Sequence, residues 1–338
     1  MKPIRVIQCY TGTIAKDQIR MITEHPQLQL VGVMVHHDNK VGLDAGELAE
    51  IESNGIITSN QLSDILELDA DVVLYNPPFE RYDEIIQILA SGKNVITPTG
   101  GCYPKLVADY DKLEQACKEG DSTFTNSGIN PGYAPDLLAM VSTAICSRVD
   151  HVHVYAGGQV DNNPSRMTMM GFTSAPEEAS LNEMFITFAI PAYKQATYLL
   201  AEGLGMALSE FDFEATFAPA LKTIDGEYPI DKGQVAGTRL STFGIVDGIR
   251  RITLETTWFV SRKAIDSDWL GKARSSGWTI EVDGRPNVSL SLDIDMSDIE
   301  GSELTAVRVI NTIPTVINMP SGAKTMLDGP IPRAWTGQ

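Results

Sequence analysis

A short segment near the start of the sequence carries residue types that could bind a pyrophosphate. An apolar run is followed at once by Tyr-Thr-Gly-Thr-Ile-Ala-Lys, and a helical pattern begins inside this segment. Gly12 would let a phosphate approach the backbone, and Ala15 is small enough for a helix to pack on the preceding strand. The amides of Thr13 and Ile14 would face the phosphates from the helix N-terminus. Tyr10 replaces the first glycine of this fingerprint, so an ordinary strand-to-helix turn is the alternative interpretation. The predicted contacts are Tyr10, Thr11, Gly12, Thr13, Ile14 and Ala15.

The end of the second apolar run bears on which dinucleotide would bind. A site that prefers NAD places an acid there, about 20 residues beyond the glycines, to accept hydrogen bonds from the ribose hydroxyls. Here the run ends at Val35 and continues His-His-Asp-Asn-Lys, with no acid at the strand end itself. His36, His37 and Lys40 could surround a ribose 2′-phosphate, or the two histidines could be solvated loop residues. The sequence favours NADP, with NAD possible.

Three further loops, each following an apolar run, are rich in glycine, proline and short polar residues. In open α/β sheets the ligand lies outside the carboxyl ends of the strands, so chemistry is expected in such loops. The amide of Asn130 could pair with a nicotinamide carboxamide, or Asn130 could be a turn residue ahead of Pro131. The predicted cofactor contacts in these loops are Asn76, Pro77, Pro78, Thr97, Thr99, Asn130, Pro131 and Gly132.

A general acid or base is harder to identify from the residues. Tyr103 and Tyr155 each carry a hydroxyl that could donate to a substrate oxygen. Glu177 or Glu178 could supply a carboxylate from a later loop, or both could be solvated charges in the first turn of a long helix. These four residues are the catalytic candidates.

The elements that would position these residues alternate over the first 130 residues between short apolar runs and segments of helical period. The predicted strands are 4–9, 28–35, a weak 56–58, 72–75, 94–97 and 122–126. The predicted helices are 15–24, 45–50, 62–67, 81–91 and 105–119. This pattern indicates an α/β fold: an N-terminal Rossmann domain over 1–133, with a doubly wound parallel sheet.

After Pro131-Gly132 the pattern changes to that of a second, α+β domain with a mixed sheet, over 134–302. It predicts helices at 134–147 and 179–204 and strands at 151–155, 250–260, 278–282 and 288–293. A last helix from Glu303 and an apolar, proline-rich tail, 303–338, are expected to return to the Rossmann domain.

Composition excludes several classes of partner. The 338 residues are 43% hydrophobic and 21% charged, and no apolar run approaches the about 18 residues of a membrane span. A formal net charge of -18 argues against nucleic acid and anionic membranes, which attract clustered Lys and Arg. Four scattered cysteines predict neither disulfides nor a cysteine metal site, and His151 and His153 lack a third ligand nearby, so we expect no metal. The sequence opens on a strand-like segment without a secretory leader, so we expect a cytoplasmic protein.

Several short motifs spread over nearly the whole chain carry a family resemblance. They lie at 40–46, 128–132, 170–172, 237–238, 244, 248, 311–316, 320–322 and 327–328. In these residues the chain resembles the dihydrodipicolinate-reductase-like oxidoreductases, which include 2,4-diaminopentanoate dehydrogenase and the native amine dehydrogenases. The resemblance implies a homodimer whose second domain carries the interface. It also implies a small carbonyl, imine or amine substrate, with NADH or NADPH acting on a C=N or C=O bond.

Two departures from the family pattern qualify what the resemblance implies. The His-His-to-Lys motif of dihydrodipicolinate reductase is replaced by His-Val-His-Val-Tyr-Ala-Gly-Gly at 151–158, which argues against a role in lysine biosynthesis. Amine-forming members carry a glutamate in the loop after the fifth strand, whereas 97–104 contains no acid. A carboxylate would bind ammonia and move its protons, so we expect amination to be slower than reduction of a ketone or preformed imine. The alternatives are a ketone or imine reductase without amination activity, or a non-catalytic cofactor-binding sensor.

Overall fold

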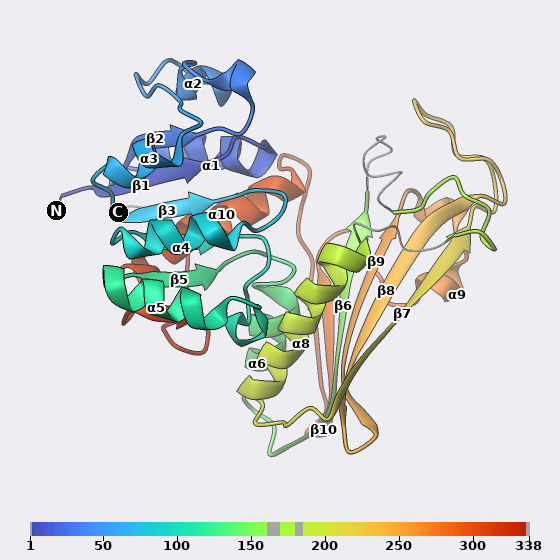
Figure 1. The fold of residues 1–338 in the computed structure, drawn as a ribbon. Helices are drawn as coiled ribbons and strands as arrows, with labels where there is room; N and C mark the ends of the chain where they lie inside the picture. Colours follow the sequence, from blue (N-terminus) through green and yellow to red (C-terminus); the bar gives the residue numbers. More distant parts are fainter. Residues whose placement is uncertain (1, 161–169, 180–184, 336–338) are drawn as a thin grey trace. The chain divides into compact units, whose positions relative to one another are not determined.

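The computed structural model describes residues 2–160, 170–179 and 185–335 (Figure 1). The chain forms two compact units. The first unit comprises Met1–Gly132 and Asp298–Gln338, and the second unit comprises Tyr133–Ser297. Among the described residues, no helix combines the length and the apolar character that crossing a bilayer requires.

A six-stranded parallel sheet forms the centre of the first unit, in the order β12-β5-β4-β3-β1-β2. Its strands are β1 (Ile4–Cys9), β2 (Leu28–Met34), β3 (Val72–Tyr75), β4 (Asn94–Thr97), β5 (Thr123–Asn126) and β12 (Gly322–Lys324). Every residue of β3 is buried, as expected when helices cover both faces of a parallel sheet. The predicted doubly wound parallel sheet is confirmed.

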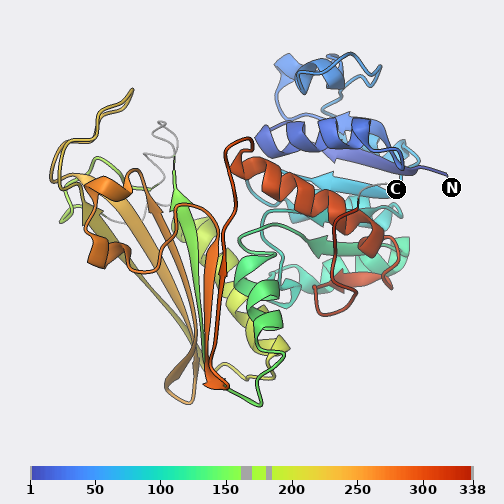
Figure 2. The same ribbon diagram turned by 180° about the vertical axis from the view of Figure 1, so that it is seen from behind.

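Helices cover the two faces of this sheet. They are α1 (Thr13–Glu24), α2 (Ala45–Leu48), α3 (Leu62–Glu67), α4 (Tyr82–Ala90), α5 (Tyr110–Gly120) and α10 (Gly301–Val316), with short 3-10 turns at Asp38–Lys40 and Pro104–Leu106. Successive residues of β1 point to opposite cores: Val6 packs with α1 and α10, and Ile7 packs with α4 and α5. Figure 1 shows α4 and α5 in front of the sheet, and Figure 2 shows α1 and α10 on its other face.

The structure of the first unit differs from the predicted elements in three places. The predicted strand 56–58 is wrong: Ile57 is 62% exposed and forms only an isolated bridge with Asp44. The helix predicted from residue 105 begins at Tyr110, because a separate 3-10 turn occupies Pro104–Leu106. Strand β12 was not predicted, since Gly-Ala-Lys has no strand pattern and becomes a strand only by pairing with β5.

The second unit is built on a six-stranded mixed sheet in the order β11-β10-β6-β9-β8-β7. Its strands are β6 (Arg148–Gln159), β7 (Glu210–Pro219), β8 (Val235–Val246), β9 (Ile249–Phe259), β10 (Trp278–Arg285) and β11 (Val288–Leu292). Strands β6 and β9 are parallel, and the other neighbours are antiparallel. The predicted mixed sheet is confirmed.

One face of this mixed sheet packs against helices α6 (Ala139–Ser142) and α8 (Ile190–Gly203) (Figure 1). A side chain at Gly244 of β8 would meet Thr197 of α8, so position 244 faces the helices. Gly244 is in register with Ile252 of β9, and Ile252 is in register with Val152 of β6. Val152 therefore lies on the helix-covered face, and its neighbours His151 and His153 lie on the opposite face.

The remaining elements of the second unit are π-helical segments at Ala134–Leu138 and Phe185–Ala189, a 3-10 turn at Arg262–Ala264 and helix α9 (Ser267–Leu270). The helix predicted at 134–147 ends earlier, at Ser142, and its first turns are π-helical. The helix predicted at 179–204 is helical from Phe185 to Gly203, and residues 180–184 lie outside the described residues.

Candidate active site

The turn between β1 and α1 has the geometry of an anion site. Gly12 is the N-cap of α1, with φ −76° and ψ 179°, and no side chain caps the helix there. The first turn of α1 contains no acidic residue, and a Cβ at Gly12 would meet nothing within 4 Å. Ala15 is fully buried beneath the turn. The amides of Thr13 and Ile14 thus start a helix whose N-terminus faces open space, which suits a pyrophosphate.

Tyr10 takes over the backbone role of the missing glycine. Its φ of 70° lies in the left-handed region that normally favours glycine. The side chain is only 7% exposed, and its hydroxyl donates a hydrogen bond to Glu84 Oε2 at 2.7 Å. Tyr75 donates to the same oxygen, also at 2.7 Å, and Arg81 pairs with the other oxygen at 2.8 Å. Burial, and then the bond to Glu84, raises the pKa of Tyr10 to about 12. The buried Tyr10 side chain therefore anchors the β1–α1 turn to helix α4, and the backbone of Tyr10 is the part that forms the turn.

The loop after β2 contacts the β1–α1 turn through one lysine. Lys40 Nζ donates to Thr11 Oγ1 at 3.0 Å and lies 3.4 Å from the Thr11 carbonyl oxygen. His36 and His37 are both exposed, and the His36 ring lies edge-on to Tyr10 with ring centres 6.3 Å apart. The structure brings Lys40 to the candidate phosphate turn and leaves the two imidazoles at its solvent side.

The loops after β3, β4 and β5 are linked to one another at the carboxyl edge of the sheet. The hydroxyls of Thr97 and Thr99 lie 3.1 Å apart, and Thr99 Oγ1 donates to the Pro77 carbonyl at 3.5 Å. The Ser127 amide donates to the Thr97 carbonyl at 2.9 Å. The backbone amide of Asn76, which follows β3, donates to the Cys9 carbonyl at the end of β1. Pro77 is buried and Pro78 is exposed.

Three asparagines at this edge of the sheet carry buried polar atoms without a partner in the described structure. They are both side-chain polar atoms of Asn76, Oδ1 of Asn126 and Oδ1 of Asn130. Buried polar groups without hydrogen bonds are rare in folded proteins, because leaving them unpaired is unfavourable. An amide ligand, such as the carboxamide of a nicotinamide ring, offers the donors and acceptors that these atoms need. Together with the open space at Gly12, this set fits a nicotinamide dinucleotide.

The backbone of the last loop is tightly constrained. The Asn130–Pro131 peptide is cis, and Gly132 has a φ of 114°. A Cβ at Gly132 would overlap the backbone of Gly128, so only glycine fits there. Arg308 of α10 donates to the Gly132 carbonyl at 3.3 Å, which fixes the end of the loop.

One acidic side chain at this edge was not predicted. Glu80, in the loop after β3, places its carboxyl group against Gly100 in the loop after β4, where any side chain at position 100 would overlap Glu80 Oε1. Burial raises the pKa of Glu80, and its own backbone amide is the hydrogen-bond donor acting on the carboxylate. The sequence indicates this carboxyl group only indirectly, because Gly100 and Gly101 have no side chains and leave room for one from another loop.

The four catalytic candidates are divided between the two units. Tyr103 is in the first unit, 9% exposed, directly before the 3-10 turn, with Lys105 Nζ 5.4 Å from its ring centre. Tyr155, Glu177 and Glu178 are in the second unit. Both glutamates are exposed and lie in a turn at 176–178, rather than in the first turn of a helix.

Tyr155 lies on the face of the mixed sheet opposite α8. Its ring stacks on His153 with centres 3.9 Å apart, and its hydroxyl donates to Glu281 Oε2 at 3.5 Å. Burial, and then the charge of Glu281, raises the pKa of Tyr155 to about 12. Within the second unit, Tyr155 therefore belongs to a group of polar side chains that contact one another on one face of the mixed sheet.

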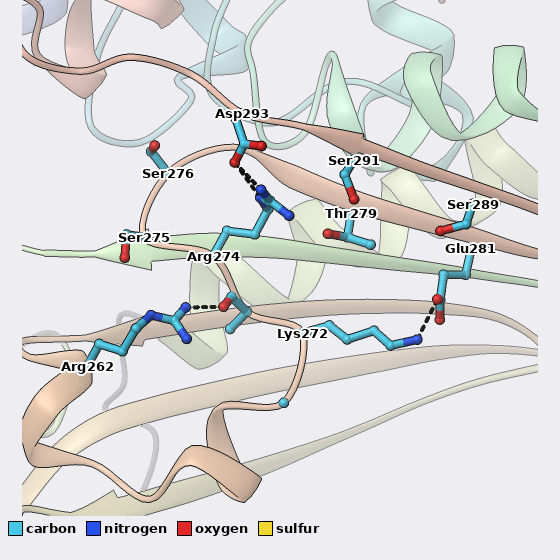
Figure 3. Close-up of a pocket in the computed structure, with 12 residues that line it drawn as sticks. Arg262, Lys272, Arg274, Ser275, Ser276, Thr279, Glu281, Ser289, Ser291 and Asp293 are labelled. Atoms are coloured by element: carbon cyan, nitrogen blue, oxygen red, sulfur yellow. Dashed lines mark hydrogen bonds and ion pairs between the residues drawn. The ribbon is translucent and has the colours of Figure 1, made fainter.

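The second unit also contains a cavity of about 610 Å³ beside β10 and β11 (Figure 3). Four of its charged side chains form ion pairs, Arg274 with Asp293 and Lys272 with Glu281, and Arg262 donates to the Ala273 carbonyl. Hydroxyl-bearing residues, among them Thr279, Ser289 and Ser291, also line it. None of the sequence-predicted site residues lines it. Within the described ranges, no three His, Cys, Asp or Glu side chains come together as a metal site would need.

Comparison with known proteins places this chain among dehydrogenases. Residues 133–338 match the family described as 2,4-diaminopentanoate dehydrogenase C-terminal domain, and residues 5–123 match dihydrodipicolinate reductase, N-terminus. The 2,4-diaminopentanoate dehydrogenase of Acetoanaerobium sticklandii is 25% identical, covering 100% of this chain and 96% of that protein. An amine dehydrogenase of Streptomyces virginiae is also 25% identical, covering 95% and 94%. The solved amine dehydrogenase of Mycobacterium smegmatis has the same fold, with a TM-score of 0.77 at 19% identity over 98% of this chain and 97% of that one.

Proposed function

The chain belongs to the 2,4-diaminopentanoate dehydrogenase C-terminal domain family, and from that premise we propose that it transfers hydride between NADP and a C=N or C=O bond of a small molecule. The family resemblance seen in the sequence motifs is confirmed, and the chain is an NAD(P)-dependent oxidoreductase. The substrate bond and the preference for NADP over NAD are the parts that we propose.

The single observation that carries the proposal is the open N-terminus of helix α1 at Gly12, in the turn that connects strand β1 of the parallel sheet to α1. A dinucleotide pyrophosphate placed there would receive the amides of Thr13 and Ile14. The unpaired amide atoms of Asn76 and Asn130, on later loops of the same sheet edge, would hold the carboxamide of the nicotinamide. When bound, the dinucleotide supplies or accepts the hydride.

Lys40 supports the preference for NADP. Its ammonium group contacts Thr11 beside the phosphate turn, whereas no acid stands at the end of β2 to bind free ribose hydroxyls. A 2′-phosphate would gain a charge-assisted hydrogen bond from Lys40, with His36 and His37 adjacent on the solvent side.

The relatives' names support a C–N bond as the reactive group, since two of them are called 2,4-diaminopentanoate dehydrogenase and amine dehydrogenase. Ketone or imine reduction without amination is the alternative outcome. It rests on the absence of an acid in the sequence of the loop after β4.

The test is a fluorescence titration of the whole protein with NADPH and NADH. We expect tighter binding of NADPH, and we expect Lys40→Ala to weaken NADPH by about tenfold, or about 1.4 kcal/mol, with little change for NADH. Lys112→Ala is the matched control, because Lys112 is an exposed lysine of α5 paired only with Asp109 among the described residues. A clear preference for NADH would refute the role assigned to Lys40.

A further inference from the structure

Glu80 reaches from one candidate active-site loop into the next. It follows β3 by five residues, and its carboxyl group occupies the space beside Gly100, in the loop that follows the neighbouring strand β4. Both loops lie at the carboxyl edge of the parallel sheet, where ligands bind in open α/β folds. A loop whose own sequence contains no acid thus has a carboxyl group beside it.

The loop after β4 is shaped around this carboxyl group. Gly100 and Gly101 both have left-handed backbones, with φ of 46° and 69°. A side chain at Gly100 would overlap Glu80, and one at Gly101 would press on the ring of Phe124. Asn126 of β5 donates to the Gly100 carbonyl at 2.7 Å and fixes the peptide from the other side. The hydrogen bond from Asn126 therefore holds Gly100 beside Glu80.

Two buried carboxylates in the first unit have evident structural partners, whereas the half-buried Glu80 has no charged partner among the described residues. Glu84 accepts hydrogen bonds from two tyrosines and pairs with an arginine, and Asp44 caps helix α2 through two backbone amides. In the part of the chain that the structure describes, no lysine, arginine or histidine pairs with Glu80. Removing a carboxyl group from water even in part is unfavourable when no positive charge compensates for it, so its position needs another explanation.

We propose that Glu80 is the acid–base residue of the reaction, exchanging a proton with the nitrogen or oxygen of the substrate bond. This inference rests on the proposed function. During reduction the substrate carbon receives hydride while its nitrogen or oxygen receives the proton of the Glu80 carboxyl group. The O–H bond breaks, its electron pair stays on the carboxylate, and the π pair of the substrate bond forms the new N–H or O–H bond. Water then returns a proton to Glu80, and amine or alcohol oxidation runs the same steps in reverse.

The surroundings of Glu80 suit this role. Its raised pKa keeps the proton available at higher pH than an exposed glutamate would, which favours a general acid. The titratable neighbours are Tyr82, whose pKa is raised by burial and then by Glu80, and Cys102, which also acts on Tyr82. Both neighbours are neutral when protonated, so neither supplies a positive charge that would hold Glu80 ionised.

The test compares Glu80→Gln with Asp83→Asn. Both changes convert an acid to its amide, and Asp83 is an exposed residue three positions away on α4. NADPH consumption is followed with a panel of short ketones, with and without ammonium chloride, across pH. We expect Glu80→Gln to lower turnover by about 10²- to 10⁴-fold and to remove one limb of the pH profile, while Asp83→Asn behaves as wild type. NADPH affinity, measured by fluorescence, should be the same in all three proteins.

A second variant separates chemistry from packing. Glu80→Ala leaves space beside Gly100, and sodium formate should restore part of its turnover because it supplies a carboxyl group to that space. The inference is overturned if Glu80→Gln binds NADPH and turns over within about threefold of wild type with an unchanged pH profile, a result that leaves the proposed function standing. Failure of the wild-type protein to bind NADPH would instead overturn the proposed function, and the role of Glu80 with it.

Discussion

Replacing Gly12 by alanine should separate cofactor binding from folding. Gly12 has φ −76° and ψ 179°, a conformation open to any residue, and the added methyl group would contact nothing within 4 Å. Alanine is a poorer N-cap than glycine by several tenths of a kcal/mol, while it also restricts the unfolded chain by about 0.4–1 kcal/mol. These two effects oppose each other. We therefore expect the free energy of unfolding in urea to change by no more than about 0.5 kcal/mol.

The same methyl group should strongly affect NADPH. It would stand where the pyrophosphate must approach the amides of Thr13 and Ile14. A hydrogen bond to a charged group contributes about 1.5–3 kcal/mol, so losing one such bond weakens NADPH binding by at least about tenfold. Fluorescence titration of the two proteins measures the ratio directly.

Gly301→Ala is the matched control for this comparison. Gly301 is the first residue of α10, in the same unit, and a Cβ there also meets nothing within 4 Å. We expect neither its stability nor its NADPH affinity to change. If Gly12→Ala keeps wild-type stability and binds NADPH within about twofold of wild type, Gly12 does not face the cofactor.

Three further predictions follow from the packing, charge and topology. Tyr10→Phe removes a buried hydrogen bond to Glu84 and should lower the free energy of unfolding by about 1.5 kcal/mol, so an unchanged urea midpoint would contradict the anchoring role. Because burial raises the pKa of Glu80, the folded protein retains a proton that the unfolded chain releases, and wild-type stability relative to Glu80→Gln should fall as pH rises from the ordinary glutamate range through the raised pKa. Equal pH dependence of the free energy of unfolding in the wild type and in Glu80→Gln would argue against the raised pKa of Glu80. Strands β7 and β11 form the edges of the second sheet, and we propose that the chain is a homodimer; light scattering that shows a monomer at micromolar concentration would exclude it.

The sequence predicted those elements whose burial follows directly from their own residues. Residues 4–9 and 72–75 read as strands because they are apolar runs buried in a parallel sheet. Ile56 and Ile57 gave the same local signal but form no strand, and Ile57 is mostly exposed. Strand β12 gave no signal because its pairing with β5 joins segments about 200 residues apart in the sequence.

Site residues were predictable where a backbone motif carries them and not where tertiary packing does. The turn at Gly12 could be found because its spacing is read along the chain. The Tyr10 side chain is anchored through Glu84, 74 residues away, so no local pattern in the sequence indicates this anchor, and the predicted cofactor contact of Tyr10 stays a prediction. Glu80 was missed because its link to Gly100 exists only when two loops from neighbouring strands meet. The sequence of the loop after β4 therefore indicates no carboxylate there.

We propose that the chain binds a nicotinamide dinucleotide and moves hydride from it to a small substrate. The most direct measurement uses NADPH deuterated at the transferable position of nicotinamide C4, incubated with the wild-type protein, the ketone panel and ammonium chloride. Mass spectrometry of the products reports where the deuterium goes. We predict an amine or alcohol carrying one deuterium on the former carbonyl carbon. Binding of NADPH with no deuterium in any product of the panel would contradict the proposed hydride transfer.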